Sequence, residues 1–257
     1  MKTLCITLMM ILSSGFCMSQ DPVDIIRKSQ TAVKVNSFEA VTTLTIADSR
    51  GNERIRQSSM ASRVFEDMTE KRIIKFTSPA EVKGTGILIY DHEDKPDDMW
   101  IYLPALKKTR RIVSSEKSKG FMGSEFSNAD MTAPAVEDFA YSLEGASEIS
   151  GTDCWMIKAS PASTELEDEY GYGSSMSWIG KDDYIVRKTN YFDFDGNLMK
   201  TIETINFKTL DPVHGKSMIT EMVATNYQNG RSSRMKMDKI QIAKTDENYF
   251  SVAYLER

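Results

Sequence analysis

The sequence predicts a mainly β fold, an α+β arrangement whose strongly curved antiparallel sheet closes only partly, as an unclosed half-barrel. Apolar and polar residues alternate with a period of two over much of the chain, which is typical of half-buried strands. Turn residues recur in the C-terminal half at steps of 14, 16 and 17 residues, so long strands follow one another directly. Helical spacing is clearest in one short segment near the beginning.

The first nineteen residues have the pattern of a cleavable secretory signal peptide. Lys2 supplies the positive end, residues 4–16 form an apolar run, and small residues precede the expected cleavage before Gln20. The run is shorter than the roughly 20 residues that a membrane-spanning helix needs. Lipid anchoring at Cys17 is the less favoured alternative, because a bulky phenylalanine precedes it. We therefore expect residues 20–257 to form one soluble domain in the periplasm.

The composition of the mature chain excludes several classes of protein. Cleavage leaves Cys154 as the only cysteine, so a disulfide within one chain is impossible. Loss of Lys2 takes the formal net charge from −5 to −6. This mild acidity, without a basic stripe, gives no sign of nucleic-acid binding.

The mature chain is expected to begin with a helix and to continue with strands. Over residues 21–34, Asp21 can cap the helix and Pro22 fits its first position. From Ser37 the period changes to two, which predicts a strand through residue 46. Further strands are expected over residues 72–77, 86–90, 99–103, 109–113, 154–160 and 174–179.

The C-terminal half predicts an antiparallel meander of long strands. Turn signals occur at residues 181–183, 195–197, 211–215 and 228–230. Strands of about 10–12 residues between them would each reach roughly 35 Å, and sheets of such strands twist and coil strongly. Met235 and Met237 share one parity whereas Ile240 and Ile242 take the other, which predicts a β-bulge between them. Neither parity is cleanly polar, so we expect apolar contacts on parts of both faces.

The middle region, residues 114–148, interrupts the strand rhythm. It contains Gly-Phe-Met-Gly-Ser-Glu-Phe at residues 120–126 and a predicted short helix over residues 134–141. Long insertions in compact domains are usually functional or disordered, and this one is too hydrophobic for disorder.

Four segments resemble the LolA-like outer-membrane lipoprotein-sorting family, in its broader and less characterised branch. They are residues 76–88, residues 99–106 with the sequence Met-Trp-Ile-Tyr-Leu-Pro-Ala-Leu, residues 108–112, and residues 120–131. The resemblance implies a curled sheet wrapped around a few helices, with a hydrophobic cavity that holds acyl chains. It also implies transport of lipids or lipoproteins across the periplasm. The resemblance assigns none of the dedicated carrier's functional residues to individual positions of this sequence.

An acyl carrier needs a water-excluded apolar pocket, because each buried methylene contributes about 0.8 kcal/mol. Methionine suits such a lining, since it is unbranched and adapts to chains of variable shape. A core-filling role is the alternative for each residue. The candidate cavity residues are Trp100, Tyr102, Met122, Phe126, Trp155, Met176, Trp178, Met218 and Met222. Phe121, Met122 and Phe126 are also candidates for a gate or a partner contact.

Catalysis finds little support in the sequence. The two histidines, His92 and His214, lie beside turn residues, and Cys154 lies on a predicted strand without a histidine nearby. The acidic residues around His92 match no zinc or calcium spacing. We expect no enzyme, no catalytic residue, no metal site and no cofactor.

The sequence thus favours a periplasmic carrier or chaperone that binds acyl chains of lipids or lipoproteins and delivers them toward the outer membrane. Its expected partners are those acyl chains, with an inner-membrane transporter and an outer-membrane acceptor as further candidates, and no nucleic acid. The alternative function is a sensing module of the same fold that binds lipid or lipoprotein and signals to a membrane partner. An outer-membrane barrel is the structural rival, because exported strands of this length could span a membrane.

Overall fold

The structure is a computed structural model and describes residues 20–93, 95–211 and 213–257. The predicted signal peptide, with the alternative anchor site Cys17, lies outside the described residues. None of the described helices is both long and apolar enough to cross a bilayer.

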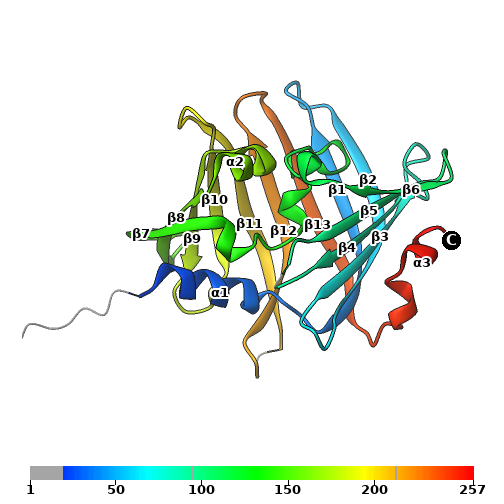
Figure 1. Cartoon of the computed structure of the whole chain (residues 1–257), viewed down its shortest axis with the longest axis horizontal. Helices are drawn as coiled ribbons and strands as arrows, with labels where there is room; N and C mark the ends of the chain where they lie inside the picture. The colour runs from blue at the N-terminus through cyan, green and yellow to red at the C-terminus, as the bar shows by residue number, and fades with distance from the viewer. Residues whose placement is uncertain (1–19, 94, 212) are drawn as a thin grey trace, which may run out of the picture.

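The described residues form a 13-stranded antiparallel sheet that is not closed, as the sequence predicted (Figure 1). Strands β1 to β6 and strands β7 to β13 each pair in chain order, and the pairing of β1 with β13 joins the two sets. The free edges are therefore β6 and β7. The strands are β1 (Ser37–Ala47), β2 (Glu53–Val64), β3 (Glu70–Ser78), β4 (Gly86–Asp91), β5 (Asp98–Leu103), β6 (Lys108–Ile112), β7 (Phe139–Ile149), β8 (Thr152–Pro161), β9 (Ser174–Gly180), β10 (Val186–Phe192), β11 (Leu198–Asp211), β12 (Lys216–Asn226) and β13 (Arg231–Ile242).

Helix α1 (Pro22–Ala32) begins as the sequence predicted and ends two residues earlier. The Asp21 side chain accepts a hydrogen bond from the Val23 amide at 2.9 Å, which satisfies one free N–H of the first turn. Ile25 and Ser29 form its buried face, and α1 contacts β7 and β12 across the inner side of the curved sheet. The remaining helices are α2 (Thr164–Tyr170) and α3 (Val252–Leu255).

The sequence-based prediction for residues 134–141 is wrong. Only a single 3₁₀ turn forms there, η4 (Val136–Asp138), and β7 begins at Phe139. Tyr141 and Leu143 then alternate toward the cluster around Ile25, which is the period of a strand and not of a helix. Strands β2 and β7 were both absent from the sequence-based prediction, and the excursion ends at residue 138 instead of 148.

The predicted bulge in β13 is confirmed. Glu39 of β1 pairs with Gln241, but Val41 pairs with Asp238, so β13 holds one extra residue between these pairs. Lys239 adopts a positive φ of 51° at this point. The bulge reverses the parity of β13, and Met237 and Ile240 therefore pack against the same inner core.

Apolar residues cover parts of both faces of the sheet, as the mixed parity indicated. The inner face carries the largest cluster, which includes Phe38, Leu44, Ile74 and Phe76. On the outer face, Ala61, Ile73 and Leu88 lie under Phe250 and Leu255 of the C-terminal segment, which contains η5 (Glu247–Tyr249) and α3. A Cβ at Gly86 would come within 2.6 Å of the Leu255 side chain, so a larger residue at this position of β4 would displace Leu255.

Candidate functional site

A cavity of about 310 Å³ lies between the inner face of the sheet, α1 and the loop after η1 (Ser114–Glu116). We call it the main cavity. Its wall is mainly apolar and rich in methionine, and it spans the junction where β1 pairs with β13. The apolar lining residues include Phe38, Leu44, Met60, Ile74, Phe76, Ile89, Phe121, Met131, Met218, Met222, Met235 and Met237.

The inner loop, residues 120–131, covers one side of the main cavity. Its 3₁₀ turns η2 (Phe121–Gly123) and η3 (Ala129–Met131) place Phe121, Phe126 and Met131 in the inner core. The Phe121 amide donates to the Phe126 carbonyl at 2.6 Å, which closes the turn between them. A Cβ at Gly120 would lie 2.5 Å from the Ser124 carbonyl oxygen, so this turn needs glycine. The aromatics that the sequence presents in a loop are therefore buried.

Polar contacts hold the outer side of the inner loop to the sheet. Arg231 of β13 donates to the Gly123 carbonyl at 2.9 Å and pairs with Glu125 (Nε to Oε1, 2.9 Å). Asn226 of β12 donates to the same carboxylate at 2.9 Å. Further contacts run from Arg56 to the Met122 carbonyl and from the Glu125 amide to Ser233. Lys200 of β11 also forms a buried ion pair with Asp130 of the loop, at 2.6 Å. The loop is thus fixed by buried apolar side chains, by a row of partly exposed hydrogen bonds and by one buried ion pair.

Helix α1 forms another side of the main cavity and is also held by polar contacts. Gln30 donates to the Pro134 carbonyl at 2.8 Å, and Arg27 pairs with Glu137 at 2.7 Å. A smaller cavity of about 210 Å³ shares Ser29, Gln30 and Val186 with the main cavity and continues toward β8, β9 and β10. A displacement of α1 would therefore enlarge the space available to a ligand.

One end of the main cavity is polar. Arg72 donates to Asp91 at 2.9 Å, and its Nε lies 3.5 Å from Glu70. Asp91 also accepts from the Ala133 amide at 3.1 Å, just after the inner loop. Burial raises the pKa of Asp91 to about 6, although the neighbouring Arg72 acts in the opposite direction. Burial likewise raises the pKa of Asp97, which lies beside this group.

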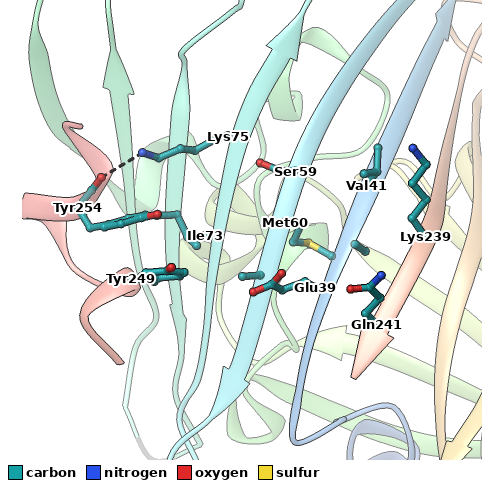
Figure 2. A pocket seen from close by; sticks show the side chains of 12 residues that line it. Glu39, Val41, Ser59, Met60, Ile73, Lys75, Lys239, Gln241, Tyr249 and Tyr254 are labelled. Atoms are coloured by element: carbon teal, nitrogen blue, oxygen red, sulfur yellow. Dashed lines mark hydrogen bonds between the residues drawn. The ribbon is translucent and has the colours of Figure 1, made fainter. Parts of the chain in front are cut away.

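An outer groove of about 380 Å³ lies on the other face of the sheet (Figure 2). Tyr249 and Tyr254 stack with ring centroids 4.6 Å apart and form one wall. Lys75 of β3 donates to the Tyr254 carbonyl at 3.1 Å, and burial lowers its pKa, with Arg257 adding to the effect. Charged side chains, including Lys239, line this groove, whereas the main cavity offers mainly apolar surface.

The structure brings five of the sequence-predicted site residues together at the main cavity. Met218 and Met222 line it together with Phe121, and Phe126 and Met122 pack in the inner core beside it. All five residues belong to the same apolar cluster.

The other predicted cavity residues lie elsewhere. Trp100 and Tyr102 lie on the outer face, in the cluster with Phe250 and Leu255. Trp155 packs with Ile25 and Tyr184 in a separate cluster under α1. Met176 and Trp178 alternate with Ser175 and Ser177, which line the smaller cavity, so their strand directs them to the opposite face.

Sequence reasoning did not identify the residues of β1 to β4 that form much of the cavity wall. Phe38, Met60, Ile74 and Arg72 all belong to alternating patterns, but a pattern of period two does not say which of two partly apolar faces encloses the cavity.

His92 and Cys154 are packed into the fold, whereas His214 is exposed and contacts only Asp211 of its own turn among the described residues, at 2.7 Å. His92 contacts Thr69 through Nδ1 at 3.0 Å and Asp98 through Nε2 at 3.3 Å. Cys154 is buried, and burial raises its pKa, which disfavours the thiolate. Within the described ranges, no three His, Cys, Asp or Glu residues gather in a geometry for metal binding.

A protein-family model described as "Uncharacterized protein" matches residues 68–257. The chain is similar to a solved domain from Vibrio parahaemolyticus described as an outer membrane lipoprotein-sorting protein, with 26% identity over 92% of this chain and 98% of that chain, and a TM-score of 0.83. A DUF1329 family protein from Desulfovibrio piger has 25% identity over 91% of this chain and 97% of its own, with a TM-score of 0.81. A LolA superfamily protein from Nitrosomonas europaea shares the fold, with a TM-score of 0.68 and 17% identity over 91% and 98% of the two chains. No curated protein sequence matches the chain.

Proposed function

This chain belongs to the LolA-like lipoprotein-sorting family, and from that premise we propose that it is a periplasmic carrier or chaperone for the acyl chains of lipids or lipoproteins. The carrier would bind its cargo reversibly, without a covalent step, and deliver it toward the outer membrane. Residues 20–257 would act as one binding domain.

The main cavity is the observation that carries this proposal. Its volume of about 310 Å³ falls at the lower end of the usual range for ligand sites, which is about 300–1,000 Å³. This is roughly ten times the volume that one water molecule occupies in the liquid, about 30 Å³, and a methylene group occupies a similar volume. Burial of about ten methylenes would contribute on the order of 8 kcal/mol, which supports strong but reversible binding.

The walls of the main cavity support a mechanism of opening and closing. The inner loop is held on its outer side by partly exposed hydrogen bonds from β2, β12 and β13. Most of them have a charged donor or acceptor, and such bonds contribute about 1.5–3 kcal/mol each. These contacts can be exchanged for water when the loop moves. We infer that the inner loop, with Phe121, Met122 and Phe126, opens as a gate, and that α1 moves to join the two cavities for larger cargo.

The proposed partners are a membrane donor, such as an inner-membrane transporter, and an outer-membrane acceptor. The Vibrio parahaemolyticus domain is described as a lipoprotein-sorting protein, which supports delivery over storage. A sensing module would also bind acyl chains, but it would retain them and report to a membrane partner. Transfer between membranes therefore distinguishes the two functions.

Native mass spectrometry with lipid extraction of the periplasmic protein tests binding. We expect bound acyl lipid, and we expect the protein to move a fluorescent acyl lipid from donor vesicles to acceptor vesicles. A protein that is empty after gentle purification and takes up no fluorescent acyl lipid would contradict both functions. Tight binding without transfer would favour the sensing module.

The exchange Met222→Glu places a charge in the cavity wall and should abolish uptake. Its matched control is Val223→Glu, the adjacent residue of β12, whose side chain points to the other face. Equal uptake by both variants would remove the main cavity from the mechanism.

A further inference from the structure

Arg72 brings an unusual donor into an apolar cavity. Its side chain keeps 20% of its surface free, and the residue lines the main cavity among Ile74, Phe76 and Ile89. A guanidinium group has five N–H donors and no acceptor. Within the described part of the chain, Arg72 donates a hydrogen bond only from Nη2, to Asp91, and its Nε has no acceptor in hydrogen-bond geometry. Most of its N–H groups therefore make no hydrogen bond to the described residues.

A second polar group in the wall is also without a partner. Thr42 of β1 lines the main cavity, is only 7% exposed, and its hydroxyl makes no hydrogen bond to any described residue. A buried hydroxyl without a partner destabilises the protein, and this cost falls when a ligand supplies the missing partner. Arg72 and Thr42 both belong to the residues that line the space that the proposed acyl chain would fill.

The charges around Arg72 restrict the ligand group that it can accept. The charged side chains that line the main cavity, with those next to them, are five carboxylates and four cations. They are Glu70, Asp91, Glu93, Asp97, Asp130, Lys34, Arg72, Lys117 and Lys200. This excess of negative charge disfavours a ligand carboxylate or phosphate in a water-poor space. The free N–H groups of Arg72 in turn repel a cationic ligand group and require an oxygen acceptor.

We propose that the main cavity selects amphiphiles whose buried polar group is an uncharged oxygen acceptor, such as an ester or amide carbonyl or a hydroxyl, seated against Arg72. This inference rests on the acyl-binding function proposed above and narrows its ligand class. Free fatty acids are disfavoured ligands, although their chains would fill the same space. The seat of the polar group lies next to the Ala133 amide, which Asp91 binds, and thus beside the end of the inner loop.

Isothermal titration at pH 8 with three ligands of equal acyl-chain length, 1-monolauroyl glycerol, methyl laurate and laurate, tests the proposal. We expect 1-monolauroyl glycerol to bind at least tenfold more tightly than laurate, and methyl laurate to bind more tightly than laurate as well. Laurate binding as tightly as the two esters would overturn the proposed selectivity and leave the carrier function intact. Failure of all three ligands to bind would overturn the carrier function itself.

Two variants separate the donor from the charge. Arg72→Met should weaken 1-monolauroyl glycerol about tenfold, whereas Lys75→Met, on the opposite face of the same strand, should leave it unchanged. Asp91→Asn removes one negative charge and should tighten laurate several-fold with little effect on the glycerol ester. Equal effects of Arg72→Met and Lys75→Met would overturn the seat at Arg72. If Arg72→Met does not fold, the comparison of ligands on the unaltered protein and the Asp91→Asn variant still decide.

Discussion

Replacement of Arg231 by alanine should open the inner loop without unfolding the sheet. Arg231 makes two contacts to this loop, a hydrogen bond to the Gly123 carbonyl and an ion pair with Glu125. Its side chain is 33% exposed, so solvent weakens the ion pair to about 0–1 kcal/mol. A hydrogen bond from a charged donor adds about 1.5 kcal/mol at the low end of its range. We expect a total loss of about 1.5–2.5 kcal/mol in the closing free energy, which is a factor of roughly 10–60 in the open population.

Amide hydrogen exchange measures this population directly. The Ser124 amide donates to the Phe121 carbonyl at 3.0 Å, and the Asn128 amide donates to the Lys119 carbonyl at 2.9 Å. Exchange at these two amides should accelerate roughly 10- to 60-fold in the variant. Amides of β4, such as those of Ile87 and Leu88, should keep their rates, because local opening leaves the central strands paired.

Arg63→Ala is a matched control for this experiment. Arg63 also makes two contacts, to the Thr245 carbonyl at 3.0 Å and to Glu247 at 2.8 Å, but these lie in the C-terminal segment. It should accelerate exchange there and not in the inner loop. The reasoning is refuted if Arg231→Ala leaves exchange in the inner loop unchanged, or if it accelerates the inner loop and β4 equally.

Three further predictions concern stability. Phe126→Ala removes a ring that is 1% exposed in the inner core and should cost about 3–5 kcal/mol in urea unfolding; a loss below 1 kcal/mol would show that the ring is not packed as described. The pKa of Asp91 is raised to about 6 from an ordinary value of 3.8, which means that the folded state binds this proton more tightly than the unfolded state. The contribution of Asp91 to the free energy of unfolding is therefore fully present below pH 3.8 and is lost as the pH rises through 6. Asp91→Asn stays neutral and should gain about 2 kcal/mol relative to the parent between pH 4 and pH 8; a difference that is constant with pH would contradict the assignment. Gly86→Ala should displace Leu255 and expose α3 to limited proteolysis, whereas Gly196→Ala, in a turn with open space around it, should leave α3 protected.

Local signals in the sequence predicted much of the fold. The Asp21-Pro22 start of α1, the turns of the C-terminal meander and the bulge before Ile240 each have a cause within a few neighbouring residues. Strand β2 was not predicted because its first half, which includes Arg54 and Arg56, is polar except for Ile55 and shows no alternation. Arg56 donates a hydrogen bond to the Met122 carbonyl, which lies 66 residues away in the sequence.

The candidate site was predictable only in part for a related reason. Parity assigns Trp100 and Tyr102 to one face of β5, but only the C-terminal segment, more than a hundred residues later, determines that this face is the outer one. The inner loop was identified because aromatic residues are unexpected in a loop. Its burial depends on contacts with β12 and β13, which no local pattern encodes.

The pairing of β1 with β13 has a consequence for how the protein folds. Ala47 lies opposite Ser232, so the first and last strands along the chain, β1 and β13, must pair before the cavity has both of its walls. Contacts so distant in sequence are slow to form, because the chain between them must be ordered first. During synthesis, which begins at the N-terminus, the cavity wall would therefore remain incomplete until residues 231–242 have left the ribosome. We expect fragments that lack β13 to bind no acyl chain, however well β1 to β6 pair on their own.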